Sequence, residues 1–246
     1  YYAYVWKGIV GAEPTFELTT YDPNTWKVKG TPISFIKDGN YTDVHLFTYD
    51  ITTGNVYAFT NVIGTGSNRM LSILDVETGK ITEIGEVTTE GIETFIPIVI
   101  ACDKNGEIYT VAGNEGTYCG SLYHVDKNTA KATRVGSTGL LPARKKMGGV
   151  VDMNTNIFYW TVVAADGSST KNGLYQVDLE TAETTLIVPF ENAEQMTGIY
   201  IQDIAPDSNV PANVTDLIFT PGDAGDFSGI ISFKVPNKTV GGSDIT

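Results

Sequence analysis

Charged residues of one sign are scarce in this sequence. Lys and Arg number 16 against 29 Asp and Glu, so the 246 residues carry a formal net charge of −13. Proteins that bind the phosphate backbone of nucleic acids need clustered Lys and Arg, and we therefore expect no nucleic-acid partner. No apolar run approaches the roughly 18 residues from which a membrane-spanning helix is built, so we expect no transmembrane segment.

Residues and motifs typical of enzymes are also few. The sequence has two histidines, His45 and His124, and each falls in an expected strand, where a histidine more often packs than catalyses. The motifs G-x-S-x-G and H-E-x-x-H, the phosphate-binding loop and the dinucleotide-binding fingerprint are absent from the sequence. We therefore predict no catalytic residues, no metal site and no cofactor.

Cysteine occurs only at Cys102 and Cys119, which is too little for a disulfide framework. Cys102 ends one expected strand and Cys119 begins another, so the two lie at opposite ends of the strand between them. That strand separates them by about 20 Å, whereas a disulfide requires Cα atoms within about 7 Å. We predict two free thiols, with Cys102 the more buried.

Glycine and aromatic residues, in contrast, are plentiful. The chain contains 26 Gly, 13 Tyr and 10 Phe, and only 18% of its residues are charged. Short segments such as SLYHVD (121–126) and GLYQVD (173–178) alternate apolar and polar residues and stop at Asp, Asn or Gly. Alternation without helical periodicity is typical of half-buried strands, and it predicts an all-β fold.

The same twelve-residue pattern occurs three times: LDVETGKITEIG (74–85), VDKNTAKATRVG (125–136) and VDLETAETTLIV (177–188). With a diverged first copy, the Asp residues that open the pattern are spaced by 53, 51 and 52 residues. Similar turns at Asp50, Asp103 and Asp152 interleave with them. Units of about 52 residues with four short antiparallel strands are typical of β-propellers, in which each unit is a blade.

The strands of the third blade are expected at 95–102, 107–112, 120–126 and 131–135. The chain begins with YYAYVWKG, which matches the second strand of a blade, so the first blade lacks its innermost strand. We predict that MTGIYIQD and its flanks, residues 195–203, supply that strand and close a ring of four blades. The alternative is a larger ring with further blades preceding Tyr1.

The repeated stretch itself is predicted to close hairpins. An Asp carboxylate can accept backbone N–H groups two and three residues further on, and Gly or Asn then adopts the left-handed conformation. Calcium binding is the alternative, because Asp and Asn gather in these turns. Ca²⁺ needs six to eight oxygen ligands, however, and DVETG lacks the spacing of D-x-D-x-D-G. We therefore expect a structural role.

Candidate ligand-binding residues are expected on the opposite face of the ring, where the longer loops lie. The run ARKK is the only dense cationic segment, and Arg144, Lys145 and Lys146 could hold a carboxylate, sulfate or acidic sugar, unless they are simply solvated. Aromatic and acidic residues of the kind that bind sugars are expected at the same rim: Tyr41, Asp43, Glu93, Phe190 and Glu191.

The end of the chain differs in composition. Residues 204–213 contain two prolines and are typical of a linker, which leaves a propeller at 1–203 and a second segment at 214–246. In that segment, VTDLIFTPG (214–222) and GIISFKVPNKTVGGSDI (229–245) resemble the opening of bacterial fibronectin type III-like domains, with the pattern I-S-F-x-x-P…T-x-x-G. The resemblance implies a partial Ig-like domain within a larger, secreted or cell-surface protein of Gram-negative gut anaerobes, many of which are named as adhesins.

Two functions remain open at this point. A non-catalytic extracellular binding or adhesion module would present propeller loops to a glycan or a protein. The alternative is a propeller-type enzyme, either a carbohydrate-active enzyme such as a polysaccharide lyase or a glycosidase, or a quinoprotein-like oxidoreductase, although quinoproteins need stacked Trp and this chain has only Trp6, Trp26 and Trp160. A third possibility is a purely structural spacer. Because no converging catalytic group is visible, binding is the function that we predict.

Overall fold

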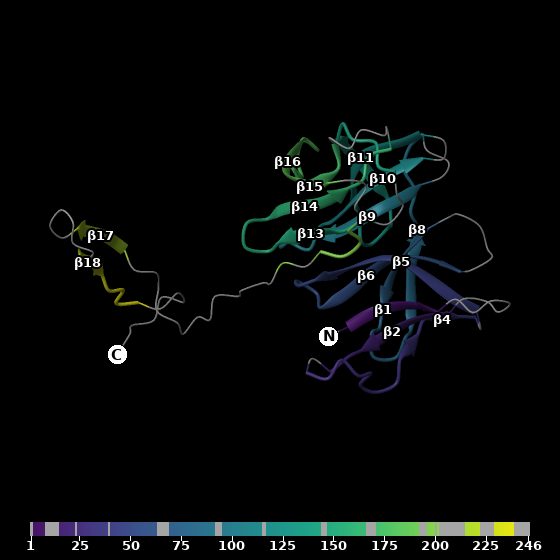
Figure 1. The fold of residues 1–246 in the computed structure, drawn as a ribbon. Coiled ribbons are helices and arrows are strands. Elements are labelled where there is room, and N and C mark those ends of the chain that lie inside the picture. Colours follow the sequence, from purple (N-terminus) through teal and green to yellow (C-terminus); the bar gives the residue numbers. More distant parts are fainter. Residues whose placement is uncertain are drawn as a thin grey trace. The chain divides into compact units, whose positions relative to one another are not determined.

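The structure of the chain is a computed structural model that consists of strands joined by turns and loops (Figure 1). It describes residues 2–7, 15–22, 24–38, 40–62, 69–91, 95–114, 117–143, 147–165, 171–191, 196–199, 201, 215–221 and 229–238. Residues 1–201 form one compact unit and residues 202–246 form a second. No helix in the described part of the chain is long and apolar enough to cross a membrane.

The third and fourth repeats each form a four-stranded antiparallel sheet, as predicted. The third blade has the order β9, β10, β11, β12, and the fourth has the order β13, β14, β15, β16. Their bounds are β9 Ile96–Cys102, β10 Ile108–Asn114, β11 Thr117–Val125, β12 Ala132–Ser137, β13 Gly149–Asp152, β14 Ile157–Val162, β15 Gly173–Val177 and β16 Thr184–Pro189.

The second blade carries one extra short strand, and the first blade carries three strands. The second has the order β4, β5, β6, β7, β8, and the first has the order β1, β2, β3. Their bounds are β1 Tyr2–Lys7, β2 Thr15–Thr20, β3 Ile33–Ser34, β4 Ile36–Lys37, β5 Asn40–Asp50, β6 Asn55–Val62, β7 Met70–Leu74 and β8 Ile81–Glu86. The inner strands pack side by side in chain order, β5 against β9 and β9 against β13 (Figure 1).

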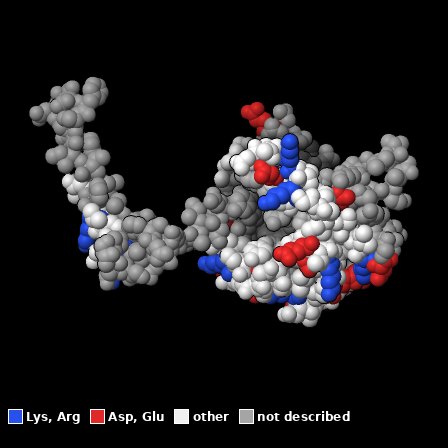
Figure 2. Space-filling view, turned by 90° about the horizontal axis from the view of Figure 1, so that it is seen from below, with Lys and Arg blue, Asp and Glu red and all other residues white. Residues whose placement is uncertain are grey.

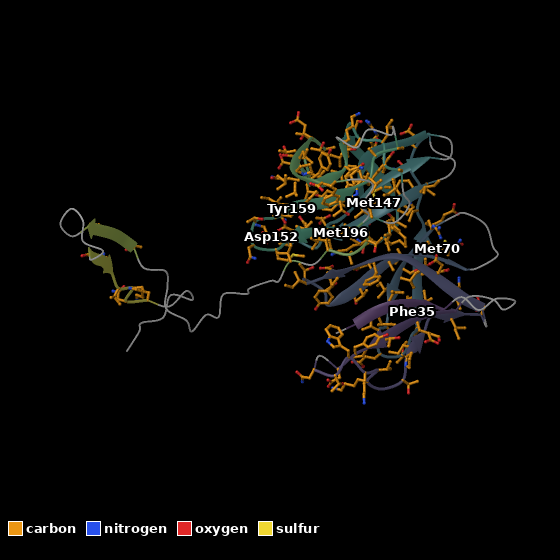
Figure 3. The ribbon with its side chains drawn as sticks, viewed as in Figure 1. Phe35, Met70, Met147, Asp152, Tyr159 and Met196 are labelled. Atoms are coloured by element: carbon orange, nitrogen blue, oxygen red, sulfur yellow. The ribbon has the colours of Figure 1, made fainter. Side chains whose placement is uncertain are left out.

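The strand predicted at 195–203 is not seen in the part of this segment that the structure describes. Residues 196–199 and 201 belong to no strand. The Met196 carbonyl instead accepts hydrogen bonds from the Gly148 N–H at 2.8 Å and the Thr161 hydroxyl at 2.7 Å, both in the fourth blade. Met196 accordingly lies beside Met147 in Figure 3. The segment therefore begins along the inner edge of the fourth blade, and residues 195, 200 and 202–203 lie outside the described residues.

The Asp-led turns have the predicted hydrogen bonds. Asp75 Oδ1 accepts the backbone N–H groups of Glu77 and Thr78 at 2.9 and 3.0 Å, and Asp126 and Asp178 repeat both bonds. We call the turns that begin at Asp75, Asp126 and Asp178 the outer turns, and those that begin at Asp50, Asp103 and Asp152 the inner turns. Each inner-turn Asp also accepts the N–H two residues further on.

The left-handed position of the outer turns differs from the prediction. Gly79 has φ +76°, but its equivalents are Ala130 with φ +60° and Ala182 with φ +66°. Alanine is strained in this conformation, and both alanines are fully buried. The contacts of each buried alanine therefore compensate for a backbone conformation that glycine would adopt without strain.

The contacts of these alanines explain why the turns recur. A Cβ built on Gly85 of β8 would lie 3.6 Å from Ala130 Cβ, and one built on Gly136 of β12 would lie 3.0 Å from Ala182 Cβ. In each case the alanine of one blade therefore packs onto a glycine in the outermost strand of the preceding blade. At the junction of the first and second blades the outer-turn residue is itself a glycine, Gly79. A Cβ at this position would lie 2.4 Å from the Ser34 carbonyl oxygen of β3, so alanine does not fit there. The repeated outer turn thus packs each blade against the outermost strand of the preceding blade.

Gly136→Ala is expected to lower the free energy of unfolding by about 1–2 kcal/mol, because the new methyl group overpacks the junction. Its Cβ would lie 2.7 Å from the Thr181 carbonyl oxygen, a backbone atom that cannot move aside cheaply. Urea unfolding measures the change. Gly198→Ala is the control, because no atom lies within 4 Å of its Cβ; equal stability of the two variants would contradict this account of the junction.

The core is divided among the blade junctions. The largest cluster, between the third and fourth blades, includes Trp160, which is 0% exposed, and Phe158. Cys102 belongs to the cluster between the second and third blades. It is a buried free thiol, as predicted, and burial, followed by the nearby Asp50, raises its pKa to about 12. The side chain of Cys119 lies outside the described residues, so its state remains a prediction.

The second unit contains a single described hairpin, which lies within the segment 214–246 that the sequence sets apart from the propeller. Strand β17, Thr215–Pro221, pairs antiparallel with β18, Gly229–Lys234. The predicted linker, 204–213, lies outside the described residues. Two strands do not make an independently stable domain, and the fibronectin type III-like identity of this segment stays a proposal.

Candidate functional site

The structure describes only part of the predicted rim. Arg144, Lys145, Lys146 and Glu93 lie outside the described residues. Tyr41 pairs with Ile36 in the β4–β5 hairpin, and its side chain is not described.

The other three predicted residues lie on two different blades. Asp43 lies in β5 of the second blade, whereas Phe190 and Glu191 follow β16 of the fourth. Phe190 is half-buried and donates its backbone N–H to the Asn172 carbonyl, and Glu191 is exposed. No common site of these residues is therefore visible in the described part of the chain.

Asp43 has a partner that the sequence did not suggest. Arg69 Nη1 lies 3.9 Å from Asp43 Oδ2, and the exposed fractions of the two side chains are 16% and 21%. Burial lowers the pKa of Arg69, and the Asp43 carboxylate opposes this change. Asp43 thus partly compensates a largely buried guanidinium, and its predicted contact with a sugar stays a prediction.

The turn face of the molecule, where inner and outer turns meet, holds a buried ion pair at the junction of the second and third blades. Lys127 Nζ donates at 2.9 Å to Asp50 Oδ2 and at 2.9 Å to the Gly106 carbonyl oxygen. Asp50 is 0% exposed and Lys127 is 24% exposed. Burial alone would raise the pKa of Asp50, but the hydrogen bonds from Lys127, Thr52 and Thr53 outweigh it and hold that pKa well below its usual value.

The neighbouring junction, between the third and fourth blades, lacks this cation. Asp103 occupies the place of Asp50, and Asn156 the place of Gly106, because each is the corresponding residue of the next inner turn, with φ +60° at Asn156 and +83° at Gly106. Leu179 follows the outer-turn Asp as Lys127 does, and it packs against the core. The space that Lys127 fills at one junction is therefore not filled by a cation at the next.

A pocket of about 320 Å³ lies at this position. We call it the junction pocket. It is lined by the inner turns of both blades, by β10, β14 and β15, and by the outer turn of the fourth blade. Its lining residues are Asp103, Asn105, Tyr109, Asn156, Ile157, Gln176, Val177, Asp178, Leu179 and Glu180. Figure 3 labels two residues that mark this region of the fourth blade: Asp152, which begins the inner turn, and Tyr159 of β14.

The Asp103 carboxylate at the junction pocket is held in place by hydrogen bonds. Asp103 is 3% exposed; its Oδ1 accepts the N–H groups of Asn105 at 2.9 Å and Glu107 at 2.8 Å. Its Oδ2 accepts hydrogen bonds from two amide groups of the described residues, Asn105 Nδ2 at 3.1 Å and Asn156 Nδ2 at 3.5 Å. The carboxylate is therefore fixed in position, while the oxygen that would correspond to the Lys127 acceptor has only neutral donors among these bonds.

The electrostatic environment of the pocket is negative. Asp103, Asp178 and Glu180 line it, and none of its described lining residues is Lys or Arg. Burial raises the pKa of Tyr109, and the charges of Asp103, Glu107 and Glu180 raise it further. The Tyr109 ring is held by an edge-to-face contact with His124, at a centroid distance of 5.4 Å. Elsewhere on the surface, acidic and basic side chains are interspersed on the face shown in Figure 2.

Sequence reasoning missed this pocket because it assigned the turn face to structure alone. The signal was nevertheless present in the repeats. The residue after the outer-turn Asp is Val76, Lys127 and Leu179 in successive blades. A charged residue at one of three equivalent positions indicates that the space beside the inner-turn Asp is filled differently from junction to junction.

Comparison with known proteins identifies the fold and no family. No protein-family model and no curated protein matches the sequence. A structure of a nidogen/laminin complex has a TM-score of 0.51 and 16% identity, covering 75% of this chain and 61% of that chain. TolB from Acinetobacter baumannii has a TM-score of 0.50 and 12% identity, covering 97% of this chain and 51% of that chain.

These matched structures are β-propellers, and the fold of this chain is an all-β propeller as the repeats predicted. The chain spans between about half and three fifths of the two matched chains. At such identities the likeness shows the fold alone, so the function has to be argued from the site.

Proposed function

We propose that this propeller is a non-catalytic binding module, secreted or displayed at a cell surface, and that the junction pocket takes its ligand, a group of an extracellular glycan or protein. Ligand pockets of this kind are concave, mostly pre-formed and lined by a few fixed polar groups. The observation that supports the proposal is the pocket itself, with the fixed Asp103 carboxylate and the Tyr109 ring on its wall. We propose further that the β17–β18 hairpin begins a fibronectin type III-like domain of a larger, adhesin-type bacterial chain.

A propeller-type glycosidase is the second candidate, because Asp103, Asp178 and Glu180 place three carboxyl groups around one pocket. Glycosidases use a pair of carboxyl groups, one of which is a general acid with a raised pKa. Asp178 does not suit that role. Its carboxylate accepts the N–H groups of Thr181 and Glu180, and these bonds lower its pKa.

The test is retention of the protein on arrays of glycans and of peptides, with release of product measured in parallel. We expect specific retention without product, and we expect the exposed charge reversal Glu180→Lys to abolish it. Glu183→Lys is the matched control, because Glu183 is exposed on the same turn and does not line the pocket. Retention that Glu180→Lys leaves unchanged would exclude the junction pocket, and release of product would establish the glycosidase instead.

A further inference from the structure

The two neighbouring blade junctions are two versions of one arrangement. In both, the Asp of an inner turn is almost fully buried, at 0% exposure for Asp50 and 3% for Asp103. In both, Oδ1 accepts the backbone N–H two residues further on, at 2.8 Å from Thr52 and 2.9 Å from Asn105. Oδ2 is the oxygen that accepts the Lys127 ammonium at the first of these junctions. The protein thus shows within its own chain what such a carboxylate binds.

At the second junction that ammonium is absent and a cavity is present. Leu179 stands where Lys127 would be, and the junction pocket of about 320 Å³ opens beside Asp103. Asp103 Oδ2 accepts instead from two neutral amides, Asn105 Nδ2 at 3.1 Å and Asn156 Nδ2 at 3.5 Å, both longer than the 2.9 Å of the Lys127 bond. Neutral amides at these distances compensate a buried carboxylate less well than a charged donor does.

We propose that the junction pocket binds a primary ammonium group, the side chain of a lysine on a protein partner. This inference rests on the binding function proposed above and names the ligand of the same pocket. The ammonium would donate to Asp103 Oδ2 as Lys127 Nζ donates to Asp50 Oδ2, and the alkyl chain would lie against Leu179 and Tyr109, which line the pocket.

The charges around the pocket fit this ligand. Asp178 and Glu180 add to the negative potential, and the Tyr109 ring offers an aromatic face to a cation. A metal ion fits less well, because among the described residues no group of three or more His, Cys, Asp and Glu side chains is arranged to hold one. The net charge of −13 also favours a basic partner.

Binding is tested first with two small probes, Nα-acetyl-lysine methylamide and Nα-acetyl-norleucine methylamide, which has the same four side-chain carbons but lacks the ammonium group. Calorimetry and chemical-shift changes at Tyr109 and Glu180 report the binding. We expect the lysine probe to bind at least about ten-fold more tightly, the usual size of one charge-assisted hydrogen bond. Equal affinity for the two probes overturns the proposal. Butylammonium distinguishes the sources: weaker binding than the lysine probe supports a peptide ligand, and equal binding shows that any alkylamine suffices and overturns the assignment to a protein partner.

The second experiment fills the junction pocket with a lysine side chain of the protein itself. Leu179→Lys restores the ammonium that Lys127 supplies at the other junction, so we expect it to reduce binding of the lysine probe more than ten-fold and to raise the melting temperature. Glu183→Lys, which adds the same ammonium group at an exposed position of the same turn that does not line the pocket, should bind the probe as the parent does. Should Leu179→Lys fail to fold, Asp103→Asn keeps an oxygen for the turn N–H groups and should lose the same ten-fold.

The outcome separates this inference from the binding function on which it rests. Glycan retention that depends on Glu180, together with no preference for the lysine probe, would leave the pocket a binding site and overturn the ammonium ligand. Retention on neither array would overturn both.

Discussion

Replacing Lys127 with Met is expected to lower the free energy of unfolding by about 3 kcal/mol, because it leaves the Asp50 carboxylate buried without its cation. Asp50 is 0% exposed, and the variant removes its 2.9 Å bond to the ammonium while keeping most of the volume of the side chain. Urea unfolding of the variant and the parent measures the difference. Lys131→Met is the matched control, since Lys131 is exposed in the same turn, and we expect it to change stability by less than about 0.5 kcal/mol.

The pairing can be separated from other effects of the substitution. Asp50→Asn in the Lys127→Met background removes the uncompensated charge, so the double variant should be more stable than Lys127→Met alone. A double variant that loses the sum of the two single losses would show that Lys127 does not act through Asp50.

The pH dependence of the destabilisation by Lys127→Met follows from the shifted pKa values of Asp50 and Lys127. The pKa of Asp50 is lowered, so its contribution to stability is present above the unfolded value of about 3.9 and is lost as pH falls through the folded pKa. The pKa of Lys127 is raised, mainly by its hydrogen bond to Asp50, so its contribution is lost only as pH rises beyond about 10.4. The difference between parent and variant should therefore be constant between about pH 5 and 9.

The repeats were sufficient to predict the blades because their signal is local. Alternating strands and Asp-led turns lie within some 50 residues of one another, and the third blade was predicted at 95–102, 107–112, 120–126 and 131–135 and found with nearly the same bounds. The Asp side chains and the N–H groups that they bind are two or three residues apart, so sequence spacing alone places them.

The junction pocket could not be predicted in the same way because its walls come from different blades. Asp103 and Leu179 are far apart in the sequence, and only the packing of one blade on the next brings their turns together. Ala130 and Ala182 show the same limit. Their positive φ contradicts their local preference and is compensated by contacts with Gly85 and Gly136 of the preceding blade. Residues whose roles depend on a junction are visible in the sequence only as differences between equivalent repeat positions.

Removing residues 196–246 is expected to lower the free energy of unfolding by about 1–3 kcal/mol, because it removes two hydrogen bonds to the Met196 carbonyl, each of which contributes about 0.5–1.5 kcal/mol. The Met196 carbonyl accepts from the buried Gly148 N–H and from the Thr161 hydroxyl, which is 2% exposed. The deletion also uncovers the inner edge of the fourth blade, along which Met196 lies, and an uncovered strand edge favours aggregation.

A protein that ends at Ile201 is the matched control for this deletion. It keeps Met196 and loses only the second compact unit, Gln202–Thr246, so it should unfold in urea at nearly the same midpoint as the parent if residues 202 and 203 add little to the closure. A protein ending at residue 195 that melts as cooperatively and at as high a temperature as the parent would show that the segment after 195 neither covers the fourth blade nor closes the ring. Loss of stability in both shortened proteins would instead place the closing contacts beyond residue 201.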